Sequence, residues 1–279
     1  MAGSLDYSVH QYGTGNYLQR LGVWGVDFER KSKYWIIYIH GGAWRDPRVD
    51  FETFAPTIDR IISSQHPLAS AIAAFASLDY RLGPHPLFPQ DPASTPVSQY
   101  RNAKHPDHLN DIRSALSYLQ KRYAFGSNYV LVGHSAGACL AFQLIGSPES
   151  ADLVLPQAIV GFEGIYDFTG INSRYRGGYA EFLTGAFGDP SCWDSAAPMK
   201  LPGSLKEGWN EGKLAALGWS RDDPLIDEPE IDGMTAKLER DGVKLVLFKD
   251  LHGGHDELWE NGADVARMIL TTLDAIYAT

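Results

Sequence analysis

The stretch from Tyr129 to Cys139 constrains the fold of this chain more than any other. A short apolar run reaches Gly-His-Ser-Ala-Gly and continues as an apolar helical pattern. This G-x-S-x-G motif between a strand and a helix is a nucleophile elbow, a sharp turn that presents its serine above the sheet. Gly133 and Gly137 fit such a turn because a Cβ two positions either side of Ser135 would clash. We expect Ser135 to be presented for attack beside free helix N–H groups.

Strand-like and helix-like segments alternate along the chain. We expect strands at 33–40, 71–79, 157–162, 213–219 and 244–249, an edge strand near 21–28, helices at 51–64, 107–123, 179–184, 234–240 and 257–277, and a proline-rich loop at 83–107. This alternation predicts an α/β fold, a mostly parallel sheet with helices on both faces. Nothing divides the 279 residues, so we expect a single domain, 1–279, with 171–205 as a cap-like insertion.

The charge balance and the cysteine count limit the partners and the compartment. The net charge is −10, from 24 basic and 34 acidic side chains, and the basic residues are scattered. We therefore expect a soluble protein with a small-molecule substrate and no nucleic-acid partner; a homodimer stays open. The first six residues do not resemble a secretory signal, and no apolar run is long enough to span a membrane. With only Cys139 and Cys192, we expect no disulfide and a cytoplasmic location.

A serine nucleophile needs a histidine base and a carboxylate that fixes the histidine's tautomer. In this type of fold the acid and then the histidine follow the serine along the chain. His252 and His255 both lie between the last strand and the last helix, and we favour His255, next to the helix. Asp222 and Asp223 follow the preceding strand, and only one can face the histidine. We favour Asp223, with Asp222 pairing with Arg221 or capping a turn.

The segment His40-Gly41-Gly42-Ala43-Trp44 directly follows an apolar strand. Consecutive glycines let bare backbone N–H groups approach a developing oxyanion, which lowers the barrier of acyl transfer. We predict an oxyanion hole made by the N–H groups of Gly41 and Gly42 with that of Ala136, after the nucleophile. His40 is interpreted as a residue that shapes this loop.

Two histidine pairs raise the question of a metal. They are His105 with His108, and His252 with His255, each three positions apart. Neither forms the helical H-E-x-x-H pattern, and Pro106 interrupts the first. We expect no metal site and no cofactor.

The motifs together resemble the α/β-hydrolase superfamily, in the branch of hormone-sensitive-lipase-like esterases. They are H-G-G-A-W, G-H-S-A-G-A, S-R-D-D-P-L-I-D-E and G-H-D-E-L-W-E-N-G. The string D-P-L-x-D-E resembles the acid motif of that branch, which supports Asp223 over Asp222. The chain resembles fungal kynurenine formamidases most, through H-G-G-A-W, Tyr80–Leu82, Val132–Ala138, Glu163–Asp167 and His255–Gly262. Ala43-Trp44 stands where many esterases have a third glycine.

This resemblance implies hydrolysis of N-formyl-L-kynurenine to L-kynurenine and formate, a step of tryptophan breakdown. Ser135 would attack the formyl carbon, and His255 would protonate the departing aryl amine. The resemblance suggests Trp44 on the small formyl side of the site. An aromatic slot for the kynurenine ring would include Tyr166, with Phe182, Trp193 and Trp219 as further candidates. A short-chain carboxylesterase and a non-catalytic binding protein on the same scaffold remain the alternatives.

Overall fold

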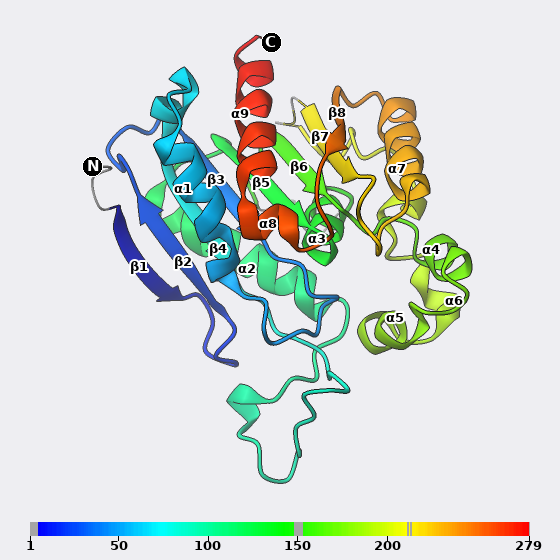
Figure 1. The fold of residues 1–279 in the computed structure, drawn as a ribbon. Helices are drawn as coiled ribbons and strands as arrows, with labels where there is room; N and C mark the ends of the chain where they lie inside the picture. Colours follow the sequence, from blue (N-terminus) through cyan, green and yellow to red (C-terminus); the bar gives the residue numbers. More distant parts are fainter. Residues whose placement is uncertain (1–4, 148–152, 211, 213, 279) are drawn as a thin grey trace.

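A computed structural model describes residues 5–147, 153–210, 212 and 214–278 (Figure 1). In these ranges eight strands form one sheet, in the order β1-β2-β4-β3-β5-β6-β7-β8. They are β1 (Asp6–Gln11), β2 (Arg20–Gly25), β3 (Tyr34–Ile39), β4 (Ile72–Leu78), β5 (Tyr129–His134), β6 (Ala158–Phe162), β7 (Leu214–Ser220) and β8 (Leu245–Leu251). β1 and β2 are antiparallel to their neighbours, and all pairings from β4 to β8 are parallel. The predicted mostly parallel sheet is confirmed.

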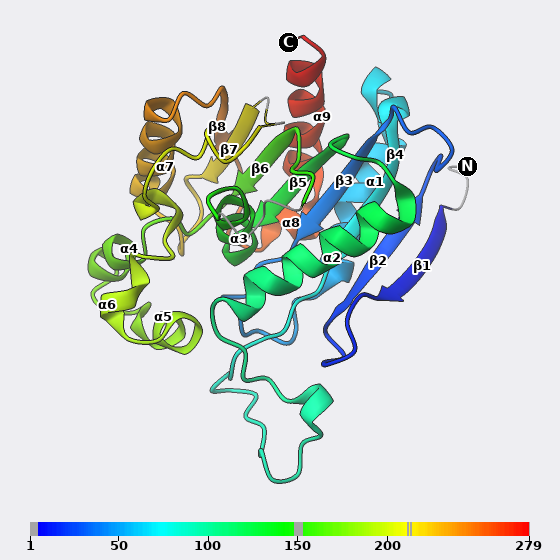
Figure 2. The same cartoon turned by 180° about the vertical axis from the view of Figure 1, so that it is seen from behind.

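Helices cover both faces of this sheet (Figures 1 and 2). One face packs on α1 (Ala55–Ser63), α8 (Glu257–Asn261) and α9 (Ala263–Tyr277), and the other on α2 (Asp107–Tyr123), α3 (Ala136–Ile145) and α7 (Glu228–Arg240). β3 shows why its sequence does not alternate between apolar and polar residues. Trp35, Ile37 and Ile39 enter one core, while Tyr34, Ile36 and Tyr38 enter the other. A strand buried on both faces needs apolar residues throughout. Among the described helices, none combines the length and the apolar character needed to cross a bilayer.

The structure departs from the sequence predictions at the chain ends and at several element boundaries. β1 was not predicted; it is a short edge strand with four exposed or half-exposed polar positions, so it carries little apolar signal. The predicted closing helix is two helices, α8 and α9, broken at Gly262, which has φ 73°. Arg60 of α1 donates to the carbonyl and the side-chain oxygen of Asn261 there. Lys213, the first residue of the strand predicted at 213–219, lies outside the described residues.

Three short helices lie between β6 and β7, in the region of the expected insertion. They are α4 (Phe168–Arg174), α5 (Ala180–Phe187) and α6 (Pro190–Trp193), and they lie together at one side of the molecule (Figures 1 and 2). The side chain of Trp44, which follows β3, packs on Phe168 and Phe187 with ring centroids 5.8 and 4.9 Å away. The insertion is therefore in direct contact with the loop that carries the glycine pair.

Candidate active site

Ser135 occupies the turn between β5 and α3 with φ 51° and ψ −116°, a conformation that is strained for a residue other than glycine. A Cβ on Gly137 would lie 2.1 Å from the carbonyl oxygen of Ile39, and one on Gly133 would lie 2.5 Å from that of Gly137. Only glycine fits at either position. The side chains around the turn leave Ser135 4 % exposed. The chain thus makes the sharp turn that its motif predicts.

The loop after β3 lies against this turn. A Cβ on Gly41 would lie 3.1 Å from the Cβ of Ser135. Within the described ranges, no acceptor is bonded to the backbone N–H groups of Gly41, Gly42 or Ala136. Unused N–H groups beside a serine are what an oxyanion hole requires. The two segments that carry the predicted donors are therefore in contact.

The side chain of Tyr80, two residues after β4, holds this loop in place. The hydroxyl of Tyr80 donates to the carbonyl oxygens of His40 and Gly41, at 3.1 and 2.9 Å, and its ring stacks on the imidazole of His40 at 4.5 Å. Burial lowers the pKa of His40 to about 4, so its ring is neutral at physiological pH. The structure thus places His40 as a loop-shaping residue. The part played by Tyr80 was not predicted, although Tyr80-Arg81-Leu82 was noted as a motif.

His255 and Asp223 meet at the carboxyl ends of β8 and β7. His255 Nδ1 lies 2.7 Å from Asp223 Oδ2, and the two side chains are 10 % and 0 % exposed. A carboxylate only accepts hydrogen bonds, so the proton is on Nδ1 and Nε2 is left as a base. Asp223 Oδ1 accepts the N–H groups of Leu225 and Ile226, at 2.7 and 3.2 Å. Burial raises the pKa of Asp223, but hydrogen bonds from His255 and Glu163 outweigh this and hold it below the usual value.

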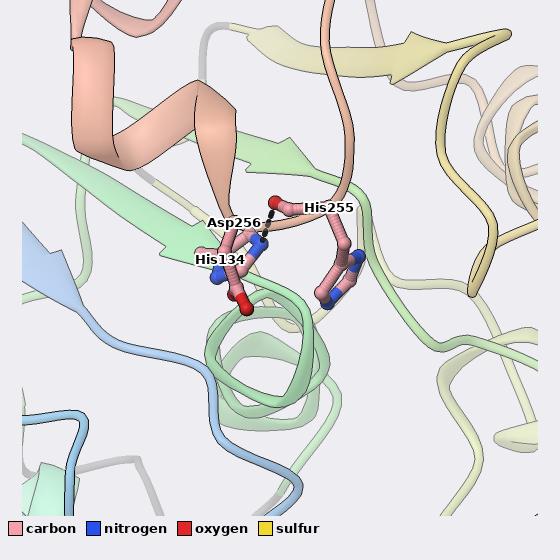
Figure 3. Close-up of side chains that lie close together, drawn as sticks. All are labelled: His134, His255 and Asp256. Atoms are coloured by element: carbon pink, nitrogen blue, oxygen red, sulfur yellow. Dashed lines mark hydrogen bonds between the residues drawn. The ribbon is translucent and has the colours of Figure 1, made fainter.

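His134, the residue before Ser135, joins the elbow to His255 (Figure 3). Its Nε2 donates to the carbonyl oxygen of His255 at 3.1 Å, and the two rings lie 4.6 Å apart. Burial and the neighbouring His255 lower the pKa of His134 well below its usual value, so the ring stays neutral. No hydrogen bond joins the Ser135 hydroxyl to His255 among the described residues. Such bonds are often long in unliganded enzymes and tighten when substrate binds.

Glu163, directly after β6, is a second carboxyl in the site, and its role there is not predicted from the sequence. Its side chain is 0 % exposed, and its backbone has φ 48°, in the left-handed region. Oε1 accepts the N–H of Ser220 at 2.7 Å, whereas no donor in the described structure faces Oε2. Ligand atoms of Glu163, Asp223 and His255 all lie within 4.8 Å of one another.

Two carboxyl groups this close need a proton between them. Burial, and then the neighbouring Asp223, raise the pKa of Glu163 to about 11. Glu163 is therefore protonated at neutral pH and donates to Asp223, which keeps the charge. It adds a fourth donor to the carboxylate of Asp223, beside His255 and the N–H groups of Leu225 and Ile226.

The alternative pair, His252 and Asp222, lies outside this cluster. His252 Nδ1 is 3.9 Å from Asp222 Oδ2, and the side chains are 85 % and 62 % exposed. Asp222 also accepts the N–H of Gly253 at 3.4 Å. The predicted partner of Asp222, Arg221, makes no ion pair with it in the described part of the chain.

The aromatic residues predicted to line the substrate slot are mostly in the core. Trp44 is 0 % exposed, and Tyr166 is 2 % exposed with its ring 5.6 Å from that of Phe142. Trp193 and Trp219 are also buried. Phe182 is the half-buried member of the set, and its ring lies 6.2 Å from that of Trp44. Contact of Trp44 and Tyr166 with a ligand stays a prediction.

Two groups of side chains in the described ranges have the composition of a metal site. They are His134 with His255 and Asp256 (Figure 3), and Glu163 with Asp223 and His255. Both include His255, whose Nδ1 donates to Asp223. In the second group Glu163 is held by Ser220 and carries a proton. A cation there would have to displace that proton and the histidine–carboxylate hydrogen bond, so the donor set favours acid–base chemistry.

The sequence of this chain is similar to those of known proteins. No protein-family model matches the chain. It is 37 % identical to the kynurenine formamidase-like hydrolase fscH of Fusarium equiseti, over 85 % of this chain and 81 % of that protein. It is 38 % identical to the kynurenine formamidase avaC of Aspergillus versicolor, over 81 % of this chain and 84 % of that protein.

Solved structures agree on the fold. The esterase LipW of Mycobacterium marinum superposes with a TM-score of 0.70 at 17 % identity, covering 99 % of this chain and 83 % of that one. An arylesterase gives a TM-score of 0.68 at 18 % identity, covering 99 % and 88 %. At such identities the likeness shows a shared fold alone.

Proposed function

This chain belongs to the kynurenine formamidase family of α/β-hydrolases, and we propose that it hydrolyses N-formyl-L-kynurenine to L-kynurenine and formate, a step of tryptophan catabolism. The observation that carries the proposal is the buried hydrogen bond from His255 to Asp223. His255 is joined to the Ser135 elbow through the hydrogen bond from His134 to its carbonyl oxygen. The second support is the similarity of the chain to named formamidases. The site geometry and the similarity are both needed, because the same catalytic residues also serve esterases.

In the first half of the reaction Ser135 is the nucleophile. His255 Nε2 takes the Ser135 proton as Oγ attacks the formyl carbon, and Asp223 stabilises the imidazolium that forms. The carbonyl oxygen becomes an oxyanion held by the N–H groups of Gly41, Gly42 and Ala136. Removing one such donor from a hydrolase costs about 10²–10³ in kcat.

In the second half the enzyme is restored. The imidazolium of His255 gives its proton to the aryl nitrogen, the C–N bond breaks and L-kynurenine leaves. A water then loses a proton to His255 and attacks the formyl ester on Ser135. Collapse of that intermediate releases formate and returns the proton to Ser135. The acyl group is only a formyl, which fits a loop whose Trp44 is packed tightly against the insertion.

We further propose that the reaction takes place in the cytoplasm and that residues 171–205 act as the cap of the single domain. Cys139 and Cys192 are both free, which suits a reducing compartment. The contact of Trp44 with Phe187 supports a cap that closes over the oxyanion loop.

A direct assay separates this function from its closest competitor. Purified protein is given N-formyl-L-kynurenine and p-nitrophenyl acetate in parallel, and kcat/KM is measured for each by absorbance. We expect the formamide to be the better substrate. Rapid hydrolysis of the acetate with negligible turnover of the formamide would instead identify a short-chain carboxylesterase, and no turnover of either would favour a binding protein.

A further inference from the structure

A cavity rich in basic side chains lies between the proline-rich loop and α5. Its volume is about 560 Å³, and its lining includes Arg45, His85, Arg101 and Lys104 with a single acidic side chain, Glu181. The whole chain carries a net charge of −10. A concentration of cations in one cavity of an acidic protein creates a local positive potential and favours an anionic ligand.

The two arginine side chains of this cavity, Arg45 and Arg101, are held by neighbouring groups. Arg45 Nη1 lies 3.2 Å from Glu181 Oε1, with the side chains 19 % and 67 % exposed, and its guanidinium lies 5.6 Å from the centre of the Phe182 ring. Arg101 donates to the carbonyl oxygen of Phe88 at 2.6 Å, while its buried Nε has no acceptor among the described residues. The cavity thus combines two guanidinium groups, one carboxylate and an adjacent aromatic face.

Arg45 links the cavity to the oxyanion loop. Its backbone N–H donates to the carbonyl oxygen of Gly42 at 2.9 Å, so it starts one turn from a predicted oxyanion donor. A smaller void shares Arg45 with the cavity and is lined by Ala43 and Trp44 of the same loop, and by Phe182. The cavity and the oxyanion loop therefore share Arg45, three residues after Gly42 in the sequence.

We infer that this cavity binds the amino-acid head of the substrate, its α-carboxylate on Arg45 and Arg101 and its α-ammonium group on Glu181. The inference rests on the proposed function and adds to it a source of selectivity for amino-acid formamides. Guanidinium groups recognise carboxylates through paired hydrogen bonds. The ion pair between Arg45 and Glu181 opens to admit a zwitterion, which supplies a new partner to each side chain. Phe182 lies where it contacts the chain that joins head and ring.

The test compares N-formyl-L-kynurenine with N-formylkynuramine, which has the same aryl formamide and ketone but no carboxylate. For Arg45→Gln and Arg101→Gln we expect KM for N-formyl-L-kynurenine to rise by about tenfold or more, the size of a lost charge-assisted hydrogen bond, with kcat little changed. Turnover of N-formylkynuramine stays at the wild-type level, which also shows that the variants are folded. Arg45→Lys keeps the charge and recovers part of the loss.

Arg30→Gln is the matched control. Arg30 is also paired with a carboxylate, that of Asp27, but it is not among the residues that line the cavity. Its replacement leaves both substrates unaffected. Equal losses on both substrates, or no change in their ratio, in the Arg45 and Arg101 variants would overturn the subsite while leaving the formamidase activity intact. Wild-type protein that hydrolyses p-nitrophenyl acetate and neither formamide contradicts the proposed function itself, and the subsite with it.

Discussion

The loops after β7 and β8 contribute two histidine–aspartate pairs, and the two differ in every physical property that matters for catalysis. His255 and Asp223 are 2.7 Å apart and almost fully buried. His252 and Asp222 are 3.9 Å apart and mostly exposed. The residue types are identical and the positions differ by one in one loop and three in the other. The surroundings, and not the sequence spacing, decide which pair can do chemistry.

Three features surround the buried pair and are missing from the exposed one. Two backbone N–H groups and a protonated Glu163 donate to Asp223, so its charge is kept although the side chain is buried. His134 donates a hydrogen bond to the carbonyl oxygen of His255 and so holds the backbone of His255 in place. An exposed pair is screened by water and contributes about 0–1 kcal/mol. The comparison teaches that burial without compensating donors would neutralise the acid instead of preparing it.

The largest expected effect is at the histidines. His255→Ala removes the base that activates Ser135, and we expect kcat for N-formyl-L-kynurenine to fall by about 10⁶-fold, as in other serine hydrolases. His252→Ala, the matched control, keeps kcat within about twofold because exposed side chains away from the site have small effects. Equal losses in both variants would remove the distinction between the pairs.

The aspartates come next. Asp223→Asn cannot hold the proton of His255 on Nδ1, and we expect kcat to fall by about 10⁴-fold. Asp222→Asn leaves kcat near the wild-type value. The measurement is kcat on the same substrate, with circular dichroism to show that both variants are folded. A larger loss of kcat for Asp222→Asn than for Asp223→Asn would show that Asp222, and not Asp223, is the acid.

Glu163→Gln tests the compensation around Asp223. Folding binds a proton at Glu163 between its usual pKa of 4.5 and its raised value of about 11, so this group makes stability fall as pH rises, by at most about 1.4 kcal/mol per pH unit. Glutamine does not titrate, yet it donates to Asp223 and accepts from Ser220. We expect activity within about tenfold of wild type and a gain in stability that grows with pH.

Urea unfolding of wild type and Glu163→Gln at pH 6 and pH 9 measures that gain. Glu239→Gln, which removes an exposed carboxyl on α7, is the control and shows no such growth. A stability difference that is the same at both pH values would show that Glu163 is ionised in the folded protein.

The smallest expected effect is on the stability of the exposed pair. The double change Asp222→Asn with His252→Ala alters the free energy of unfolding by less than about 0.5 kcal/mol, as is usual at exposed sites. Urea unfolding at low and high salt measures this. A loss of several kcal/mol would mean that this pair is part of the folded site.

The sequence alone was sufficient to predict where the elbow turn, the glycine loop and the pair of His255 and Asp223 lie, because each of these follows directly from a strand end. It also fixed α2 to the residue, since Leu109, Ile112, Leu116 and Leu119 share one face. The break at Gly262 was missed although it carries a local signal, a glycine that ends α8 in the left-handed region. Glu163 was missed because its partners, Ser220 and Asp223, lie far along the chain; Ser220 is 57 residues away.

Hydrolysis of N-formyl-L-kynurenine by wild type and by Ser135→Ala is the most direct test of the central claim, that Ser135, His255 and Asp223 act as one unit on a formamide. The two proteins are purified in parallel, and release of kynurenine is followed by absorbance, with circular dichroism to show that the fold is kept. We expect clear turnover by wild type and a loss of about 10⁶-fold in Ser135→Ala. Substantial turnover by a folded Ser135→Ala variant would contradict the account.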